Sequence, residues 1–177
     1  MAKPKRALLV IDMQNDYLWD ARKAMFSYDT PALVASVNSA IHAHQAAGDD
    51  VIYIAQMFPD LITNRWIIGF SIKGTEGAAL FGGLDIVSDL YFEKNLPDTY
   101  SSRPFRDHTA RAGYEEVVLC GLDECGCVGA TAKGAVKTGV KVTLLEDCIG
   151  RRFPDEKVQR MRASLRALGC VYTSSAS

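Results

Sequence analysis

The alternation of short apolar runs with longer segments of helical spacing is the feature that most constrains this chain. Six runs rich in β-branched residues are strand candidates, at 7–12, 51–56, 90–93, 116–121, 141–146 and 170–173. Helical spacing occupies the ranges 31–47, 127–137 and 155–168. A glycine suited to a left-handed C-cap precedes a strand at Gly48, Gly113, Gly139 and Gly169. This order predicts an α/β fold with three α/β/α layers, doubly wound around a six-stranded, mainly parallel, Rossmann-like sheet.

Length and charge limit the kind of protein this chain forms. The 177 residues fit one domain spanning 1–177, and the 48% of hydrophobic residues can fill a single core. The formal net charge of -1 provides no field to attract nucleic acid or an anionic membrane. The apolar run that follows the basic N-terminus is too short for a signal peptide, and no transmembrane segment is evident. We therefore expect a cytoplasmic protein with a small-molecule partner.

The segment 120–128 places a thiol where a nucleophile is expected. It reads Cys-Gly-Leu-Asp-Glu-Cys-Gly-Cys-Val, an apolar strand that runs into a glycine-punctuated turn and a helix opened by Cys127. A helix start presents unpaired N–H groups and a positive dipole end, which lower a thiol pKa and can hold an oxyanion. The spacing of Cys120, Cys125 and Cys127 fits neither a zinc pair nor an iron–sulfur run, so we expect no metal there.

Two further reactive groups stand at predicted strand ends. Asp12 ends the first strand, Lys94 follows the third and Cys127 follows the fourth. The carboxyl ends of parallel strands share one edge of the sheet, where reactive groups gather. Each residue also has a structural interpretation, because an aspartate can cap a turn, a lysine can be solvated and a cysteine can pack in a core. The coincidence of all three at one edge favours a catalytic site.

The stretch 57–88 interrupts the alternation with prolines, glycines and large apolar residues. We interpret it as an elaborated loop beyond a strand end, a position that commonly builds a pocket. Phe58, Trp66 and Phe70 are candidates for a pocket lining or a subunit contact. Simple coverage of the sheet is an equally good interpretation of each residue. Two roles therefore remain for the loop, as a lid or as an interface.

Three motifs resemble those of a known family. The segment 8–17 reads Leu-Leu-Val-Ile-Asp-Met-Gln-Asn-Asp-Tyr, Lys94 is followed six residues later by Tyr100, and 117–128 carries a glycine six residues before the Cys-Val pair. In this order they resemble the cysteine hydrolases of the isochorismatase-like superfamily, which includes nicotinamidases and N-carbamoylsarcosine amidohydrolase. The chain departs from the pattern around Tyr100, where Asp-Thr-Tyr replaces two small residues and phenylalanine, and at Glu124, where threonine is frequent.

The resemblance implies a catalytic triad of Asp12, Lys94 and Cys127. Lys94 would favour the thiolate, and Asp12 would take the thiol proton and return it to a leaving amine. The family's oxyanion hole uses the backbone N–H groups that correspond to Asp123 and Cys127. It follows a cis peptide that would join Leu122 to Asp123.

The comparison with this family also suggests which residues line the pocket, that the chain assembles with copies of itself, and that it uses no cofactor. Candidate pocket residues are Gln14, Phe58, Tyr100 and Asp123, and the family's habit of assembly implies a homo-oligomer. Nicotinamidases hold a metal with a D-x-H motif and a further histidine, whereas segment 55–60 reads Ala-Gln-Met-Phe-Pro-Asp. No histidine lies between His44 and His108, so we expect neither a metal nor another cofactor.

The sequence thus predicts a cysteine-dependent amidohydrolase that cleaves the C–N bond of a small-molecule amide or carbamoyl compound through a thioester. Isochorismatases proper lack the nucleophile, so Cys127 favours amide chemistry. A redox-active thiol protein is one alternative, in which Cys125 or Cys148 traps an oxidised Cys127, although passive packing of both is the simpler interpretation. A non-catalytic small-molecule-binding protein is another, although no glycine-rich phosphate loop follows the first strand.

Overall fold

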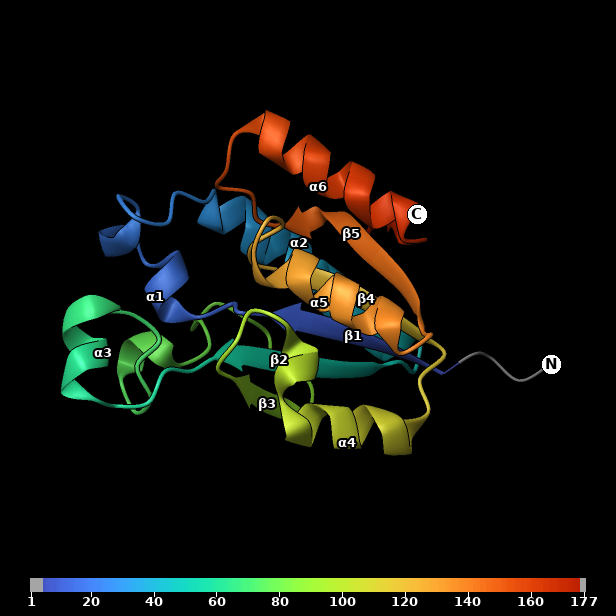
Figure 1. Cartoon of the computed structure of the whole chain (residues 1–177), viewed down its shortest axis with the longest axis horizontal. Helices are drawn as coiled ribbons and strands as arrows, with labels where there is room; N and C mark the ends of the chain where they lie inside the picture. Colours follow the sequence, from blue (N-terminus) through green and yellow to red (C-terminus); the bar gives the residue numbers. More distant parts are fainter. Residues whose placement is uncertain (1–4, 176–177) are drawn as a thin grey trace.

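A single sheet of parallel strands organises the computed structural model, which describes residues 5–175. Its strands are β1 (Arg6–Ile11), β2 (Asp50–Gln56), β3 (Tyr91–Lys94), β4 (Glu116–Gly121), β5 (Lys141–Ile149) and β6 (Val171–Thr173). They lie in the order β3-β2-β1-β4-β5-β6, and every neighbouring pair is parallel (Figure 1). The predicted α/β class and six-stranded sheet are confirmed, and the sheet is parallel throughout rather than mainly so.

Helices cover both faces of this sheet (Figure 1). The α-helices are α1 (Asn15–Leu18), α2 (Thr30–Ala46), α3 (Ile62–Ile67), α4 (Arg103–Ala112), α5 (Cys127–Lys137) and α6 (Asp155–Ala167). Short 3-10 helices are η1 (Asp20–Arg22), η2 (Glu76–Ala78) and η3 (Thr99–Ser101). Among the helices of residues 5–175, none has the length and apolar character needed to cross a membrane.

Alternate side chains of the central strand β1 enter two separate cores. Leu8 and Val10 pack in a core with residues of α2, whereas Leu9 and Ile11 pack in a second core with residues of α4, α5 and α6. All four side chains are fully buried, as the doubly wound arrangement requires. The chain order reverses beside β1, with β2 on one side and β4 on the other. This reversal is the switch point at which such sheets form their crevice.

Most predicted boundaries lie within one residue of the observed ones, and the differences occur near the strand ends. Lys94 is the last residue of β3 rather than the residue after it, and Asp12 lies just beyond β1 with a φ of 54°. β5 runs to Ile149, three residues further than predicted, after a register shift against β4. The predicted glycine C-cap positions have positive φ at Gly48, Gly113, Gly139 and Gly169.

The two segments that leave the strand pattern meet beyond the carboxyl edge of the sheet. One spans 13–28 and contains α1 and η1, and the other spans 57–88 and contains α3 and η2. An isolated antiparallel bridge joins Gln14 to Leu80, and the carboxylate of Asp16 accepts a hydrogen bond from the Ser71 N–H at 2.8 Å. The stretch predicted as a loop therefore has short helices and fixed contacts to the first segment.

Candidate active site

The ends of β1, β3 and β4 bring a carboxylate, an amine and a thiol to one place. The Nζ of Lys94 lies 3.0 Å from Oδ2 of Asp12, and the Lys94 side chain is fully buried. The same Nζ donates a 2.7 Å hydrogen bond to Oε1 of Gln56, the last residue of β2. Cys127 begins α5, and electrostatic interactions link its thiol to both Asp12 and Lys94. Strand and helix ends thus fix all three reactive side chains.

The end of β4 approaches β1 so closely that only glycine fits. Gly121 has a φ of 104°, and a Cβ atom there would lie 2.1 Å from the carbonyl oxygen of Ile11. The chain leaves β4 at this glycine and continues through a cis peptide between Leu122 and Asp123. This geometry brings the start of α5 beside Asp12 at the end of β1.

The turn between β4 and α5 presents unpaired backbone donors. The carbonyl oxygen of Asp123 accepts hydrogen bonds from the N–H groups of Gly126 and Val128, at 2.9 and 3.1 Å. The N–H groups of Asp123 and Cys127 have no acceptor within residues 5–175. Donors of this kind at a helix start suit an oxyanion. We retain them as the candidate oxyanion hole.

The Asp123 side chain holds this turn to two other segments. Its Oδ1 accepts from the N–H of Cys125 at 2.9 Å. Its Oδ2 accepts from the N–H of Arg152 at 3.0 Å and from the hydroxyl of Tyr28 at 3.1 Å. Burial raises the pKa of the carboxyl group, while these three hydrogen bonds and Arg152 act against the rise. Asp123 therefore connects the turn to the segment before α2 and to the loop after β5.

The electrostatics of the thiol differ from the sequence-based expectation. Burial, followed by the charge of Asp12, raises the pKa of Cys127 to about 12, although Lys94 acts to lower it. Burial also acts to lower the pKa of Lys94, but Asp12 and Cys127 raise it above its ordinary value. This direction is opposite to the lowered thiol pKa expected from the helix start, because desolvation and Asp12 together outweigh Lys94. The resting site holds a neutral thiol beside a lysine–aspartate ion pair.

One carboxylate oxygen of the ion pair is positioned to accept a proton. Asp12 Oδ1 is buried and has no hydrogen-bond partner within residues 5–175, whereas Oδ2 is bound to Lys94. A buried acceptor without a hydrogen bond costs free energy, so binding a proton donor there is favourable. A proton from the adjacent Cys127 thiol would satisfy it.

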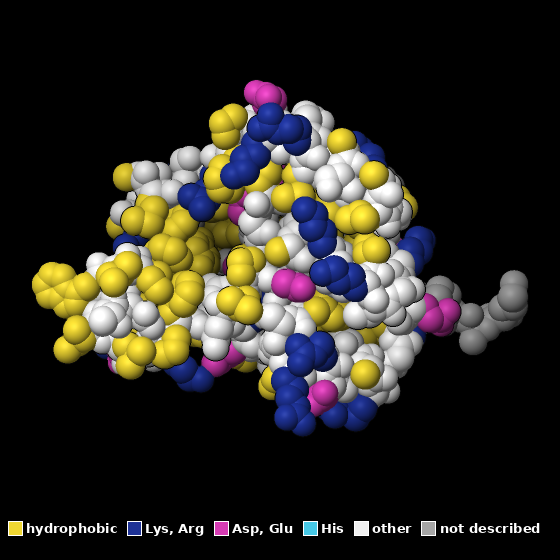
Figure 2. Space-filling model, in the orientation of Figure 1, with side chains coloured by type: hydrophobic (Ala, Val, Ile, Leu, Met, Phe, Trp, Pro, Cys, Tyr) yellow, Lys and Arg dark blue, Asp and Glu magenta, His cyan; other side chains and the backbone are white. Residues whose placement is uncertain are grey.

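A cavity of about 410 Å³ opens over these groups and reaches Asp12, Cys127 and Asp123. Figure 2 shows hydrophobic side chains gathered around the hollow. Six aromatic residues line it: Tyr17, Phe26, Tyr28, Phe58, Phe70 and Phe153. Edge-to-face contacts join several of the rings, such as Tyr17 to Phe26 with centroids 4.8 Å apart. The cavity wall is mostly apolar, and Asp12, Asp123 and Cys127 are among its few polar residues.

The predicted pocket residues have different positions. Phe58 lines the cavity, but Gln14 and Tyr100 do not. The Gln14 side chain is fully buried, accepts from the Gln56 N–H at 2.9 Å and donates to the Gln56 carbonyl oxygen at 3.0 Å. Tyr100 packs in the core against Phe105, with ring centroids 5.0 Å apart. Gln14 thus acts behind the site by holding the end of β2, and Tyr100 belongs to the core.

Sequence reasoning missed two polar contributors to the site. Gln56 binds Lys94, and its position at the end of β2 was the available signal. Arg152 lines the cavity, and its guanidinium lies 5.3 Å from the ring centroid of Phe26 and 4.7 Å from that of Phe153. No sequence motif identified Arg152, because it lies on a loop after β5.

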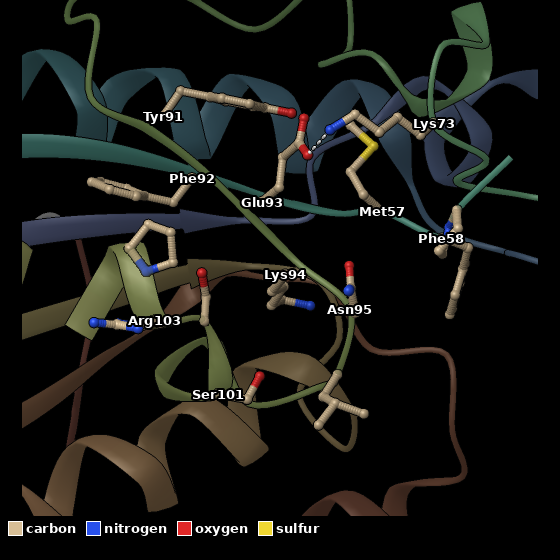
Figure 3. Close-up of a pocket in the computed structure, with 14 residues that line it drawn as sticks. Met57, Phe58, Lys73, Tyr91, Phe92, Glu93, Lys94, Asn95, Ser101 and Arg103 are labelled. Atoms are coloured by element: carbon tan, nitrogen blue, oxygen red, sulfur yellow. Dashed lines mark hydrogen bonds and ion pairs between the residues drawn. The ribbon is translucent and has the colours of Figure 1, made fainter. Parts of the chain in front are cut away.

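A larger groove of about 770 Å³ runs beside β3; Lys94 lines it, but Asp12 and Cys127 do not (Figure 3). Glu93 and Lys94 point to opposite sides of β3, and Lys73 binds Glu93 at 2.6 Å. The groove shares Phe58 with the cavity as part of a common wall. The thiol of Cys127 and the carboxylate of Asp12 open into the smaller cavity, which is therefore the candidate active site.

The residues around the site do not suit a metal ion. Gln56 and Phe58 stand near the end of β2, and the ammonium of Lys94 occupies Oε1 of Gln56. Within residues 5–175, no cluster of three or more histidine, cysteine, aspartate or glutamate residues could hold a metal. A cation placed here would meet the charge of Lys94.

The other cysteines are free thiols in different surroundings. Cys120 is buried in β4 and directs its thiol to the Leu9 carbonyl oxygen at 3.6 Å. Cys148 is buried in β5 and lies 3.4 Å from the Ser36 carbonyl oxygen. Cys125 is partly exposed in the turn. Cys127 is the cysteine placed beside Asp12 and Lys94.

Comparison with known proteins identifies relatives of the whole fold. The family model described as Isochorismatase domain matches residues 6–177. The uncharacterized isochorismatase family protein YddQ of Bacillus subtilis strain 168 is 27% identical over 143 residues, which cover 80% of this chain and 75% of that protein.

Solved structures share the fold at lower identity. N-carbamoylsarcosine amidase from Thermoplasma acidophilum has a TM-score of 0.81 and 24% identity, with 98% of each chain covered. Nicotinamidase PncA from Bacillus subtilis has a TM-score of 0.83 and 21% identity, covering 96% of this chain and 99% of that one. Pyrazinamidase of Pyrococcus horikoshii, solved in complex with zinc, has a TM-score of 0.82 and 21% identity, covering 97% of this chain and 99% of that one.

Proposed function

The chain belongs to the isochorismatase family, and on that premise we propose that it is an amidohydrolase that cleaves the C–N bond of a small amide or carbamoyl compound. The observation that supports this proposal is that Asp12 and Cys127 line one apolar cavity, while the buried ammonium of Lys94 lies 3.0 Å from the Asp12 carboxylate. Relatives of the fold named as nicotinamidase and N-carbamoylsarcosine amidase support the reaction class.

The first half of the proposed reaction forms a thioester. As Sγ of Cys127 attacks the carbonyl carbon, the thiol proton passes to Oδ1 of Asp12. The carbonyl oxygen gains the negative charge and accepts hydrogen bonds from the N–H groups of Asp123 and Cys127. When the C–N bond breaks, the proton on Asp12 moves to the nitrogen, and ammonia or an amine leaves.

The second half hydrolyses the thioester with the same groups. Asp12 takes a proton from water as the water oxygen attacks the carbonyl carbon. The tetrahedral intermediate collapses, the C–S bond breaks, and the thiolate of Cys127 recovers the proton from Asp12. The acid product leaves, and the enzyme returns to its neutral thiol.

Lys94 is assigned an electrostatic role throughout this cycle. Its ammonium lies 3.0 Å from Asp12, so it holds the carboxylate in place beside the thiol. Gln56 fixes the ammonium from the opposite side at 2.7 Å. The raised pKa of Cys127 means that the nucleophile forms only as the proton moves, and not in the resting enzyme.

Ammonia release from a panel of small carboxamides and carbamoyl compounds tests the proposal. We expect the wild-type protein to release ammonia from at least one compound, and Cys127→Ala to abolish the release. Cys125→Ala is the matched control and should keep most of the activity, because its thiol has no contact with Asp12 or Lys94. Hydrolysis that survives Cys127→Ala would contradict the nucleophile assignment.

Trapping the intermediate separates this mechanism from a redox role. Added hydroxylamine should divert the thioester to a hydroxamate, and an acid quench should leave Cys127 carrying the acyl mass. A stable Cys125–Cys127 disulfide without any acyl adduct would favour a redox-active thiol protein instead.

A further inference from the structure

Two side chains that line the cavity, Tyr17 and Gln56, carry hydrogen-bond donors that no group within residues 5–175 accepts. Tyr17 is partly buried, and only 5% of Gln56 is exposed. A buried donor without an acceptor costs free energy, so it indicates a partner outside the chain. The proposed reaction uses neither donor, and both are therefore available to a ligand.

The amide of Gln56 is oriented with its nitrogen away from Lys94. Its Oε1 accepts the 2.7 Å hydrogen bond from Nζ of Lys94. An ammonium group has donors only, so the amide oxygen and not the amide nitrogen must face it. The side chain of Gln14 holds the backbone N–H and carbonyl oxygen of Gln56 at 2.9 and 3.0 Å. Nε2 of Gln56 is therefore the atom left for a ligand, with both of its protons.

The hydroxyl of Tyr17 is restricted in a similar way, because a donor already occupies its oxygen. Oγ of Ser71 donates to Oη of Tyr17 at 2.8 Å, which leaves the phenolic proton to be donated elsewhere. Burial, followed by the charge of Asp12, raises the pKa of Tyr17 above its ordinary value, so the hydroxyl keeps this proton at neutral pH. The charge of an ionised Cys127 acts in the same direction. The hydroxyl thus lies within electrostatic reach of both reactive groups.

Ser71 makes this contact from an unfavourable backbone conformation. It is fully buried and has a φ of 51°, in the left-handed region that disfavours residues other than glycine. Its N–H donates to Oδ2 of Asp16 at 2.8 Å, and Oδ1 of Asp16 accepts from Arg22 at 2.9 Å. Gly77 lies so close to this carboxylate that a Cβ atom there would be 2.3 Å from Oδ1. These contacts fix the serine that donates to Tyr17.

We propose that Tyr17 and Gln56 select a ligand that carries a hydrogen-bond acceptor, such as a ring nitrogen or a carbonyl oxygen, next to its amide group. Both donors line the cavity that holds Asp12 and Cys127, so the selected ligand places its carbonyl carbon near the thiol. An acceptor pairs with the two free donors, whereas an N–H or O–H group in the same place meets donors whose orientation is fixed. The ligand class follows from the hydrogen bonds, and its being the substrate rests on the proposed function.

Ligand binding to Cys127→Ala tests this selection without turnover. Three flat carboxamides of similar shape are the probes: thiazole-2-carboxamide has a ring-nitrogen acceptor, thiophene-2-carboxamide has no ring nitrogen, and pyrrole-2-carboxamide has an N–H donor. In NMR titrations of isotope-labelled protein, we expect the Kd of the thiazole compound to be about tenfold lower than that of the thiophene compound, as one or two hydrogen bonds provide. The pyrrole compound should bind most weakly. Equal binding of the thiazole and thiophene compounds, or no binding of the thiazole compound, would overturn the proposal.

The contribution of Tyr17 is measured in the same Cys127→Ala background. Tyr17→Phe removes the hydroxyl and keeps the ring, so the preference for the thiazole compound should fall several-fold. Tyr28→Phe is the matched control, because the Tyr28 hydroxyl belongs to the same cavity but already donates to Asp123 at 3.1 Å. The control should keep the preference, and circular dichroism melts establish that both variants are folded. An unchanged preference in Tyr17→Phe, or an equal fall in both variants, would overturn the role of Tyr17.

Two further substitutions test the orientation of the donors. Ser71→Ala leaves the oxygen of Tyr17 free to accept, so the pyrrole compound should bind more tightly relative to the thiophene compound. Gln56→Glu keeps an oxygen for Lys94 and replaces the donor Nε2 with an acceptor oxygen, so the preference for the thiazole compound should fall. Failure of either change would overturn the orientation assigned to that side chain.

Turnover by the wild-type protein separates the ligand class from the proposed function. The kcat/KM values of the three amides should follow the order of their binding to Cys127→Ala. An order that does not depend on the acceptor would overturn its role in substrate choice. A wild-type protein without amidase activity, whose Cys127→Ala variant keeps the preference for the thiazole compound, would contradict the proposed function and support the ligand class.

Discussion

Glu124 and Arg162 form a bidentate ion pair inside the protein, with Nε–Oε1 and Nη2–Oε2 distances of 2.6 and 3.0 Å. The Glu124 side chain is fully buried and that of Arg162 is 7% exposed. Glu124 lies in the turn before α5, and Arg162 lies on α6. The pair therefore ties α6 to the turn that carries the candidate oxyanion donors.

Removing the arginine of this pair should destabilise the fold. Arg162→Ala leaves the Glu124 carboxylate buried without its partner, a change that costs about 3–5 kcal/mol in comparable pairs. Arg160→Ala is the control, because Arg160 and Glu156 form an exposed pair one turn apart on the same helix, worth about 0.5 kcal/mol or less. Urea unfolding followed by circular dichroism measures both. Equal losses in the two variants would contradict the structural role of the buried pair.

Both members of the Lys94–Asp12 pair should be required for activity, and their contributions to stability should be coupled. Asp12→Asn removes the proton acceptor, and Lys94→Met removes the charge that holds it, so each should lower kcat/KM by about 10²–10⁴. Each single variant should also lower stability, because it leaves a buried group without its partner. The double variant Asp12→Asn/Lys94→Met should be more stable than the sum of the single losses predicts. Additive losses would mean that the pair is not coupled.

The rate at which Cys127 is alkylated should depend on pH as the raised pKa of its thiol predicts. With a pKa of about 12, the thiolate fraction and the iodoacetamide rate should rise about tenfold per pH unit from neutral to alkaline pH. Asp12→Asn removes a charge that raises this pKa, so alkylation at a fixed pH should accelerate. Lys94→Met removes a charge that lowers it, so alkylation should slow. A plateau at neutral pH would show a thiolate in the resting enzyme and refute the neutral-thiol description.

The Asp123 carboxylate should affect turnover more than binding. Asp123→Ala keeps the backbone N–H at this position but removes the acceptor for Cys125, Arg152 and Tyr28. We expect kcat to fall about tenfold, equivalent to about 1.4 kcal/mol, with a smaller change in KM. Tyr28→Phe is the milder comparison, because it removes one of the three donors. A change confined to KM would assign Asp123 to substrate binding instead of positioning.

Treatment with a metal chelator should leave the activity of the enzyme unchanged. Near the end of β2 the chain offers Gln56 and Phe58 in place of histidine or carboxylate ligands, and Lys94 already binds Gln56. We expect dialysis against EDTA to preserve kcat/KM and added zinc to give no stimulation. Loss of activity on chelation, restored by a divalent cation, would contradict this expectation.

The local spacing of apolar residues was sufficient to predict the sheet and its principal helices. Buried parallel strands are nearly continuous apolar runs, and β4 was located to the residue for that reason. Helix α4 was missed because its residues are mostly polar and only Phe105 is buried. The end of β5 was misplaced because Glu146 and Asp147 are polar while the strand continues through a register shift to Ile149.

The candidate site was predictable where it depends on strand ends and not where it depends on loops. Asp12 and Cys127 follow β1 and β4, and Lys94 ends β3, so sheet topology alone brings them together. The pKa of Cys127 depends on burial, which the sequence does not state. Arg152 reaches the cavity through the path of a loop, which has no periodicity to read.

Two different parts of the chain build the cavity, and this separates its chemistry from its selectivity. The strand ends and the start of α5 supply the carboxylate, the amine and the thiol, whereas most of the aromatic wall comes from the two segments beyond the sheet edge. Exchange of residues 57–72 for a different sequence would therefore remodel the wall without moving the reactive atoms. The fold can thus diversify by replacing its outer segments, and an engineer can redirect it by the same route.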